Sequence, residues 1–195
     1  MLALTRAPLL APLMARHPAL RFDLDASNEL ANLTRRDADI ALRATRRPPE
    51  HLVGRRLGAV RVAVFAHARQ AVARGVSPGP RRTPALTELA ALPWAAPDDA
   101  LPNHPSVCWR RKHLPKVEPR LALHSLLAVM EAVAAGVGVG IVPLFLARAY
   151  AGVVALTEPL SECETDLWLL AHPESRHLRR IAVVAAGLAE QIRLE

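Results

Sequence analysis

The chain has 195 residues, of which 51% are hydrophobic, enough for one large domain or two small lobes with a packed core. Its formal net charge of +7 would favour a nucleic-acid partner, but nearly all the basic residues are arginines, which are scattered along the chain, many of them in pairs. Aromatic residues make up only 4%, too few for a surface that stacks bases. We therefore do not read the charge as a DNA-binding surface.

The first 22 residues resemble a short signal peptide, with an apolar stretch behind Arg6. Pro8 and Pro12 interrupt that stretch, and no clean cleavage site follows. The pattern favours an amphipathic helix over residues 4–16 instead. Its expected buried stripe consists of Leu9, Leu10, Leu13 and Met14.

The next segments predict a strand, a helix and a strand. The alternating "ALRFDLDA" (19–26) predicts the first strand, "SNELANLTRR" (27–36) predicts a helix capped by Ser27, and "ADIALR" (38–43) predicts the second strand. Further along, "RVAVFA" (61–66) predicts a buried strand, and "ARQAVARG" and "TPALTELAAL" predict two short helices within residues 67–92.

The second half continues the alternation. "SVCWRR" (106–111), "VEPRLALH" (117–124) and "DLWLLAH" (166–172) predict strands, and "HLRRIAVVAAGLAEQI" (177–192) predicts an amphipathic closing helix. A short helix is expected from Pro143 to Tyr150. Strands that alternate with helices indicate an α/β fold with a mostly parallel sheet.

The glycine-rich stretch "AAGVGVGIVP" (134–143) resembles a phosphate-binding loop, which would need its glycines between a strand and the start of a helix. Here a helix with Ser125 as its cap precedes Gly136, which suits the left-handed residue that ends a helix, and a short buried strand of a parallel sheet follows. The order is the reverse of a phosphate loop. The anion-friendly end of the unit is its start, at His124 and Ser125.

Catalytic and metal chemistry find little support in the sequence. Cys108 and Cys163 stand alone and are expected to be reduced thiols. The histidines lack metal-ligand spacing, and no G-x-S-x-G motif surrounds Ser125. No apolar run is long enough for a membrane span. We therefore expect no metal, no cofactor and no membrane partner.

In their order along the chain, these segments resemble the effector-binding domain of LysR-type transcriptional regulators. The segments "HPALRFDL", "LTRRDADIALR", "LVGRRLGAVRVAVFA", "LTELAALPW", "SLLAVMEAVAAGVGVGIVP" and "DLWLLAHPESRHLRRIAVVAAGLAEQI" carry the resemblance, which covers nearly the whole chain. It implies two Rossmann-like lobes joined by two crossover strands, similar to type 2 periplasmic binding proteins. A small-molecule effector would lie in the cleft between the lobes.

The resemblance also implies an organisation of the chain. The first lobe would comprise residues 1–59 plus 168–195, the second lobe residues 60–167, and the crossovers would lie near 62–65 and 166–170. The protein would be a cytoplasmic regulator that forms a homodimer or tetramer, with contacts from residues 4–16 and the helix 126–135. Leu10 and Met14 would offer apolar surface for that contact.

Two parts of the family pattern have no counterpart in this sequence. The winged helix-turn-helix that reads DNA precedes the effector domain in the family, so this chain alone is expected to bind DNA only weakly and without sequence preference. The first strand of the effector domain would also lie before Met1. Its loss would leave the first lobe truncated, with "RFDLD" and "DIALR" unpaired at one edge.

Four residues are candidates for effector binding, and each has a structural alternative. Ser125, at a helix start without acidic residues, suits an anion but is equally explained as a helix cap. Arg43, which ends the "DIALR" strand, could pair with an anionic effector or form an ordinary salt bridge. Ser27 lies at the carboxyl edge of a strand, where α/β folds bind ligands, or is simply a cap. Asp98 would face the cleft or lie on an exposed loop.

We therefore predict a ligand-sensing regulatory module and not an enzyme. The first alternative is an exported or stand-alone solute-binding protein of the same fold, which a cleaved N-terminus near residue 16 would indicate. The second alternative is an α/β enzyme, which chemical change of a bound compound would indicate.

Overall fold

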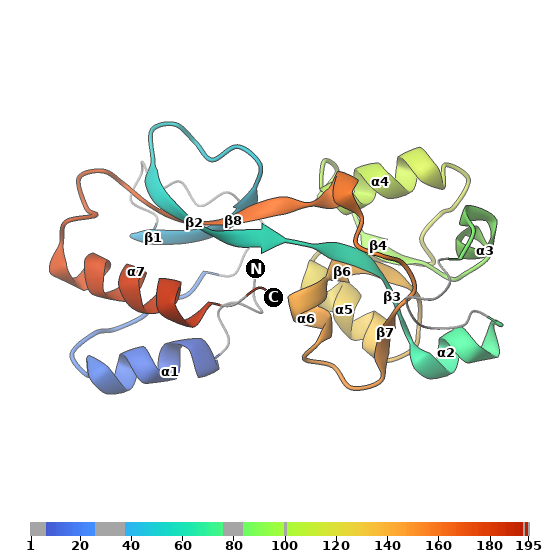
Figure 1. Ribbon diagram of the computed structural model, residues 1–195, viewed down its shortest axis with the longest axis horizontal. Helices are drawn as coiled ribbons and strands as arrows, with labels where there is room; N and C mark the ends of the chain where they lie inside the picture. The colour runs from blue at the N-terminus through green and yellow to red at the C-terminus, as the bar shows by residue number, and fades with distance from the viewer. Residues whose placement is uncertain (1–6, 26–37, 76–83, 100, 193, 195) are drawn as a thin grey trace. The chain divides into compact units, whose positions relative to one another are not determined.

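The computed structural model describes residues 7–25, 38–75, 84–99, 101–192 and 194. The chain divides into two compact units, which we call unit 1 (residues 1–60 and 165–194) and unit 2 (residues 61–164). It therefore leaves unit 1 after Val60 and returns to it at Thr165. Figure 1 labels the helices and strands of both units.

Unit 1 contains one sheet and two helices. Its elements are α1 (Ala7–Arg16), β1 (Ile40–Thr45), β2 (Val53–Val60), β8 (Thr165–Ala171) and α7 (Arg179–Gln191). β8 lies between β1 and β2 and is antiparallel to both. β2 leads out of the unit and β8 leads back into it, so the two strands run in opposite directions where they pair.

The predicted closing helix is confirmed, since α7 buries Ile181 and Leu188. α1 packs beside α7, as Figure 1 shows, and Leu13, which is 1% exposed, fills the contact. The predicted stripe of the first helix is partly wrong. Leu10 and Leu13 are buried, whereas Met14 is 51% exposed. Leu10 is therefore not available for contact with a second copy of the chain. Met14 is the residue of this stripe that exposes most of its apolar side chain.

Residues 19–25, expected as a strand, contain none in the described structure. An extended segment becomes a strand only where a neighbour accepts its backbone hydrogen bonds, and the sheet of unit 1 places β8 and not this segment beside β1. The expected strand at 38–43 is found at Ile40–Thr45.

Unit 2 contains short strands and helices in alternation. Its elements are β3 (Val62–His67), α2 (Ala68–Ala73), α3 (Leu86–Ala90), β4 (Ala95–Pro97), α4 (Pro105–His113), β5 (Leu121–Leu123), α5 (Leu126–Ala134), β6 (Gly140–Pro143), α6 (Leu144–Ala147), β7 (Val153–Ala155) and the 3-10 turn η3 (Ser161–Cys163). β3 lies between β6 and β7 and is antiparallel to both, while β4 and β5 form a parallel pair.

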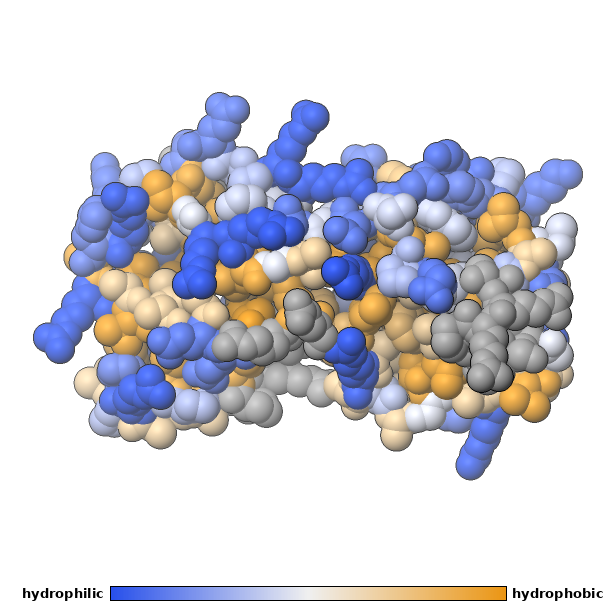
Figure 2. Space-filling view, in the orientation of Figure 1, coloured by the Kyte–Doolittle hydropathy of each residue, from blue (hydrophilic) through white to orange (hydrophobic). Residues whose placement is uncertain are grey.

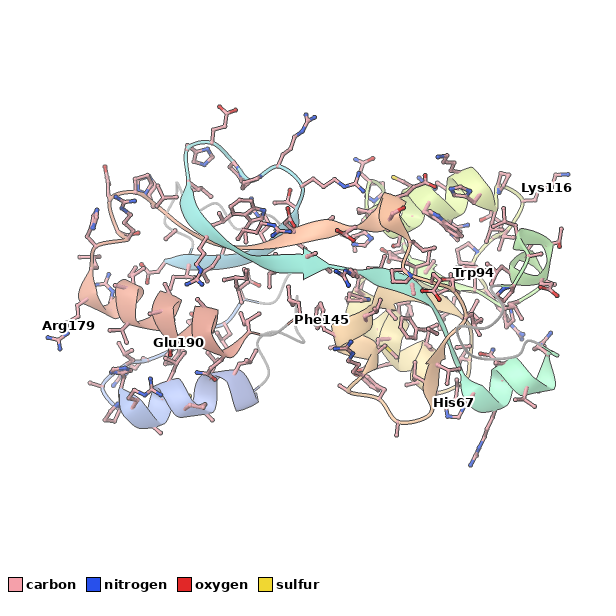
Figure 3. All side chains as sticks on the ribbon, viewed as in Figure 1. His67, Trp94, Lys116, Phe145, Arg179 and Glu190 are labelled. Carbon is pink, nitrogen blue, oxygen red and sulfur yellow. The ribbon has the colours of Figure 1, made fainter. Side chains whose placement is uncertain are left out.

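The core of unit 2 lies between these strands and α5. Val129, Met130 and Val133 of α5 are fully buried. A Cβ on Gly140 would lie 2.8 Å from Val129 Cγ1, so the glycine allows α5 to approach β6 closely. Trp94, labelled in Figure 3, is 2% exposed, and its indole Nε1 donates to the Leu89 carbonyl oxygen at 2.8 Å.

Two expectations for unit 2 are wrong. "SVCWRR" is not a strand but part of α4, which begins with Pro105 at its first turn and is capped by His104. Val107 and Arg110, three residues apart, share its buried face. The sheet is also not mostly parallel, because β3 pairs antiparallel with both β6 and β7, and only β4 and β5 form a parallel ladder among the described strands. β6 is buried as expected but belongs to the antiparallel sheet.

Candidate functional site

The parallel strands β4 and β5 end side by side. Pro97 pairs with Leu123 in the ladder, and the Asp98 N–H donates to the Leu123 carbonyl oxygen at 2.9 Å. Asp98 therefore lies at the same carboxyl edge as His124 and Ser125, which follow β5 directly. Ligands of α/β folds bind outside this edge of parallel strands. Asp98 is half-buried and engaged in a further interaction, so it is not a free loop carboxylate.

Ser125 is the N-cap of α5, as the sequence predicts. Its backbone is extended, with φ −146° and ψ 151°, and its Oγ accepts from the Ala128 N–H at 3.1 Å. Gly136, with φ 71°, follows the other end of the helix. No acidic residue lies in the first turn of α5. Within the described part of the chain, the N–H groups of Leu126 and Leu127 have no acceptor, so this helix start can donate to an anion.

A second helix, α4, begins after β4 in the same way. His104 caps it: the Ser106 N–H donates to His104 Nδ1 at 3.3 Å, and the Ser106 Oγ lies 2.7 Å from that atom. Burial lowers the pKa of His104 from 6.5 to about 4, so the imidazole is neutral at pH 7. The first turn of α4 also contains no acidic residue.

The chemistry of this edge follows from the two helices. Each follows a strand of the same parallel pair, and neither has a carboxylate in its first turn to offset the positive end of its dipole. Basic residues lie at the opposite end of α4, where they suit the dipole. The edge therefore suits a negatively charged group held by hydroxyl and backbone N–H donors.

The other predicted site residues lie elsewhere. Arg43 belongs to unit 1, where it is half-buried in the middle of β1 opposite Trp168 and does not end the strand, which continues to Thr45. Ser27 lies outside the described residues. The structure thus brings Asp98 and Ser125 to one edge of unit 2.

Three polar groups near α4 are absent from the predicted site. His104 was hidden because the helix it caps was expected to be a strand; the Pro105 that follows it was the available signal. Glu162 of η3 lies between Lys112 Nζ at 2.6 Å and His113 Nε2 at 2.8 Å. Arg110, 7% exposed, donates to the Val117 carbonyl oxygen. Glu162 thus links η3 to α4, and Arg110 links α4 to the segment that follows it.

Metal and membrane chemistry gain no support here. Among the described residues, no three His, Cys, Asp or Glu side chains are placed to hold a metal ion together. The described helices are all too short or too polar to span a bilayer. Cys108 is exposed and Cys163 buried, and both are free thiols.

Two compact α/β units that the chain connects twice are typical of the type 2 periplasmic-binding-protein-like fold, a class of ligand-binding domains. A family model described as LysR substrate binding domain matches residues 2–193, and the chain belongs to this family. The predicted fold class is therefore confirmed. The family comprises effector domains of transcriptional regulators and is not a family of enzymes.

Known structures and one curated protein are similar to this chain. The regulatory domain of CrgA, a LysR-type regulator from Neisseria meningitidis, has a TM-score of 0.79 and 22% identity, over 99% of this chain and 94% of that one. The effector domain of AmpR from Pseudomonas aeruginosa has a TM-score of 0.66 and 19% identity, over 94% and 86%. An HTH-type transcriptional regulator of Xanthomonas campestris pv. campestris (strain 8004) is 42% identical over 60 residues, 31% of this chain and 17% of that protein.

Proposed function

We propose that this chain is the effector-sensing domain of a LysR-type transcriptional regulator and that it binds a small anionic molecule. The observation that carries the proposal is the start of α5, where the Ser125 hydroxyl and two N–H groups without acceptors lie at the carboxyl edge of β4 and β5. A carboxylate of the effector would accept from these donors. Family membership supports a regulatory role over catalysis.

The proposed ligand would bind in the cleft between two lobes, residues 1–59 plus 168–195 and residues 60–167. Asp98 and Ser125 would contact it from the second lobe, and Arg43 and Ser27 from the first. Arg43 suits a carboxylate because its planar guanidinium donates two parallel hydrogen bonds. Asp98 would accept a hydrogen bond from a hydroxyl or amine of the effector. It would therefore favour an effector that carries such a donor in addition to its carboxylate.

The remaining partners follow from the family. We propose a cytoplasmic homodimer or tetramer in which residues 4–16 and the helix 126–135 make the contact, with Met14, 51% exposed, as its apolar surface. Specific DNA binding would belong to a winged helix-turn-helix. The chain alone would bind DNA weakly and with steep salt dependence, since arginines contact phosphates without reading bases.

A pair of variants of equal size tests the anion site. Ala128→Glu places a carboxylate at the third position of α5, and Ala128→Gln places a neutral amide there. Both side chains can complete a capping box with Ser125, so both should preserve the helix. Only the glutamate should repel an anion.

The measurement is a thermal-shift titration with acetate, succinate and benzoate. We expect at least one carboxylate to raise the Tm of the wild type and of Ala128→Gln, and to raise that of Ala128→Glu much less. The same shift in all three proteins would show that α5 does not bind the anion. If no small carboxylate shifts the wild type while neutral analogues do, the anionic character of the effector is wrong.

A further inference from the structure

Unit 1 contains a pocket that the proposed effector site does not use. It lies between α7 and the sheet face formed by β1, β8 and β2, with a volume of about 300 Å³. Its lining includes Arg55, Leu169, Arg176, Ile181, Ala185 and Ala189. This size lies at the lower end of the range of small-molecule sites.

The residues of α7 explain why the pocket is hollow. Ala185, Ala186 and Ala189 of α7 line it and carry only methyl groups. Its floor is well packed, because Ile181 and Leu169 are at most 6% exposed. Among the residues that the structure describes, the apolar lining is entirely aliphatic. Figure 2 shows orange hydrophobic surface beside α7 bordered by blue hydrophilic side chains.

Two arginines give the pocket its charge. Arg55 and Arg176 line it and are both exposed. Arg176 donates through Nε to His177 Nε2 at 2.9 Å, which leaves its two terminal nitrogens for another acceptor. The nearby carboxylate of Asp39 lies 4.0 Å from Arg180 instead. Among the described residues, no carboxylate pairs with Arg55 or Arg176, so the pocket combines an aliphatic floor with uncompensated positive charge.

We propose that this pocket is a second ligand site, which binds a small aliphatic carboxylate. Its hydrocarbon chain lies between α7 and the sheet, and its carboxylate accepts hydrogen bonds from Arg176 and Arg55. The aliphatic lining favours a flexible saturated chain over an aromatic ring. Because every described lining residue belongs to unit 1, this site is separate from the edge of β4 and β5 and stands whether or not that edge binds an effector.

The test is a calorimetric titration of the whole chain with butanoate, hexanoate and octanoate. Burial of each methylene group should tighten binding about fourfold, so octanoate should bind about fifteen times more tightly than hexanoate, at one molecule per chain. 1-Octanol carries the same chain without the charge and should bind more weakly than octanoate. An affinity that does not depend on chain length would overturn the proposal.

Matched variants locate the site. Ala185→Leu fills the pocket and should abolish octanoate binding, whereas Ala182→Leu, on the exposed side of α7, should not. Arg176→Gln should weaken octanoate severalfold and leave 1-octanol unchanged, while Arg179→Gln, at a side chain that extends outward in Figure 3, should change neither.

Two outcomes of these variants would contradict the site. Undiminished octanoate binding by Ala185→Leu would place the ligand elsewhere. If Arg176→Gln and Arg179→Gln weaken octanoate binding equally, the effect comes from the net charge of the protein and not from a contact with Arg176. If Ala185→Leu does not fold, chemical-shift changes in the wild type decide: they must concentrate on residues 53–55 and 181–189, and changes confined to unit 2 overturn the assignment.

Discussion

Leu13 of α1 occupies the space beside Gly187 of α7 that a side chain would otherwise take. A Cβ on Gly187 would overlap Leu13 Cδ2 and would lie 3.1 Å from its Cγ. Leu13 is only 1% exposed, so the surrounding core gives it little room to move. The close approach of the two helices therefore depends on glycine in the middle of α7.

Gly187→Ala tests this dependence, because two effects of opposite sign compete. Alanine is a better helix former than glycine by about 1 kcal/mol, whereas overpacking of a rigid core costs about 1–3 kcal/mol. With an overlap this severe we expect a net loss of about 1–2 kcal/mol in the free energy of unfolding, measured by urea denaturation. In a Leu13→Ala background the same change should be neutral or stabilising. If Gly187→Ala alone is more stable than the wild type, the close contact between Leu13 and position 187 is wrong.

Segments with a long, regular hydrophobic period could be predicted from the sequence. α7 and α5 repeat apolar residues at helical spacing, and Ser125 and Gly136 mark the two ends of α5, so propensity and burial agree there. α4 could not be predicted in this way. "SVCWRR" is short enough to fit a strand or a helix, and the choice depends on the His104 cap and on burial of Val107 and Arg110 within unit 2.

Strand direction and site geometry depend on long-range pairing. The order of strands along the chain does not reveal that β8 returns between β1 and β2, which makes that sheet antiparallel. Ser125 could be predicted as the cap of α5 because a helix start is a local feature. The position of Asp98 beside Ser125 depends on the hydrogen bond from its N–H to the carbonyl oxygen of Leu123, a residue distant in sequence. A pattern within one segment carries no information about that contact.

Glu162 should control access to the buried Cys163. Its carboxylate joins η3 to Lys112 and His113 of α4, and the Cys163 Sγ donates to the Pro105 carbonyl oxygen at 3.4 Å. The hydrogen bond from Lys112, with a smaller effect of His113, lowers the pKa of Glu162. The ionised Glu162 therefore stabilises the fold fully above its ordinary pKa of 4.5. This stabilisation is lost as the pH falls through the lowered pKa of the folded protein.

We expect Glu162→Gln to loosen η3 and to speed the reaction of Cys163 with a thiol reagent severalfold at neutral pH. Cys108 is exposed and should react quickly in every variant, which provides an internal reference. Glu158→Gln, at an exposed position outside this cluster, is the matched control. Identical Cys163 rates in both variants would mean that the ion pairs do not hold η3 in place.

Ser125 has a capping role that can be separated from its proposed ligand contact. Ser125→Ala removes the acceptor for the Ala128 N–H and should cost about 1 kcal/mol of stability without any ligand. Ser125→Asn restores a capping oxygen and should recover most of that loss. Denaturant titration of the ligand-free proteins measures both. If alanine and asparagine destabilise equally, the Ser125 side chain does not cap α5.

The stability of the chain should fall in mild acid because of His104. Its Nδ1 accepts from the Ser106 N–H, so protonation of that atom breaks the cap, and burial lowers the pKa from 6.5 to about 4. Between pH 6.5 and about 4, His104 is protonated in the unfolded chain and neutral in the folded chain. The free energy of unfolding therefore decreases as the pH falls through this range and levels off below about 4.

The full shift of His104 corresponds to about 3 kcal/mol, and for a half-buried ring we expect a loss of about 1–3 kcal/mol. His104→Asn keeps a capping acceptor but cannot titrate, so it should remove that part of the pH dependence while it retains α4. His51→Asn, at an exposed histidine, controls for the substitution itself. The measurement is the free energy of unfolding in urea at several pH values from about 7 to about 4.5. Parallel pH profiles for the wild type and His104→Asn would show that the cap does not titrate in this range.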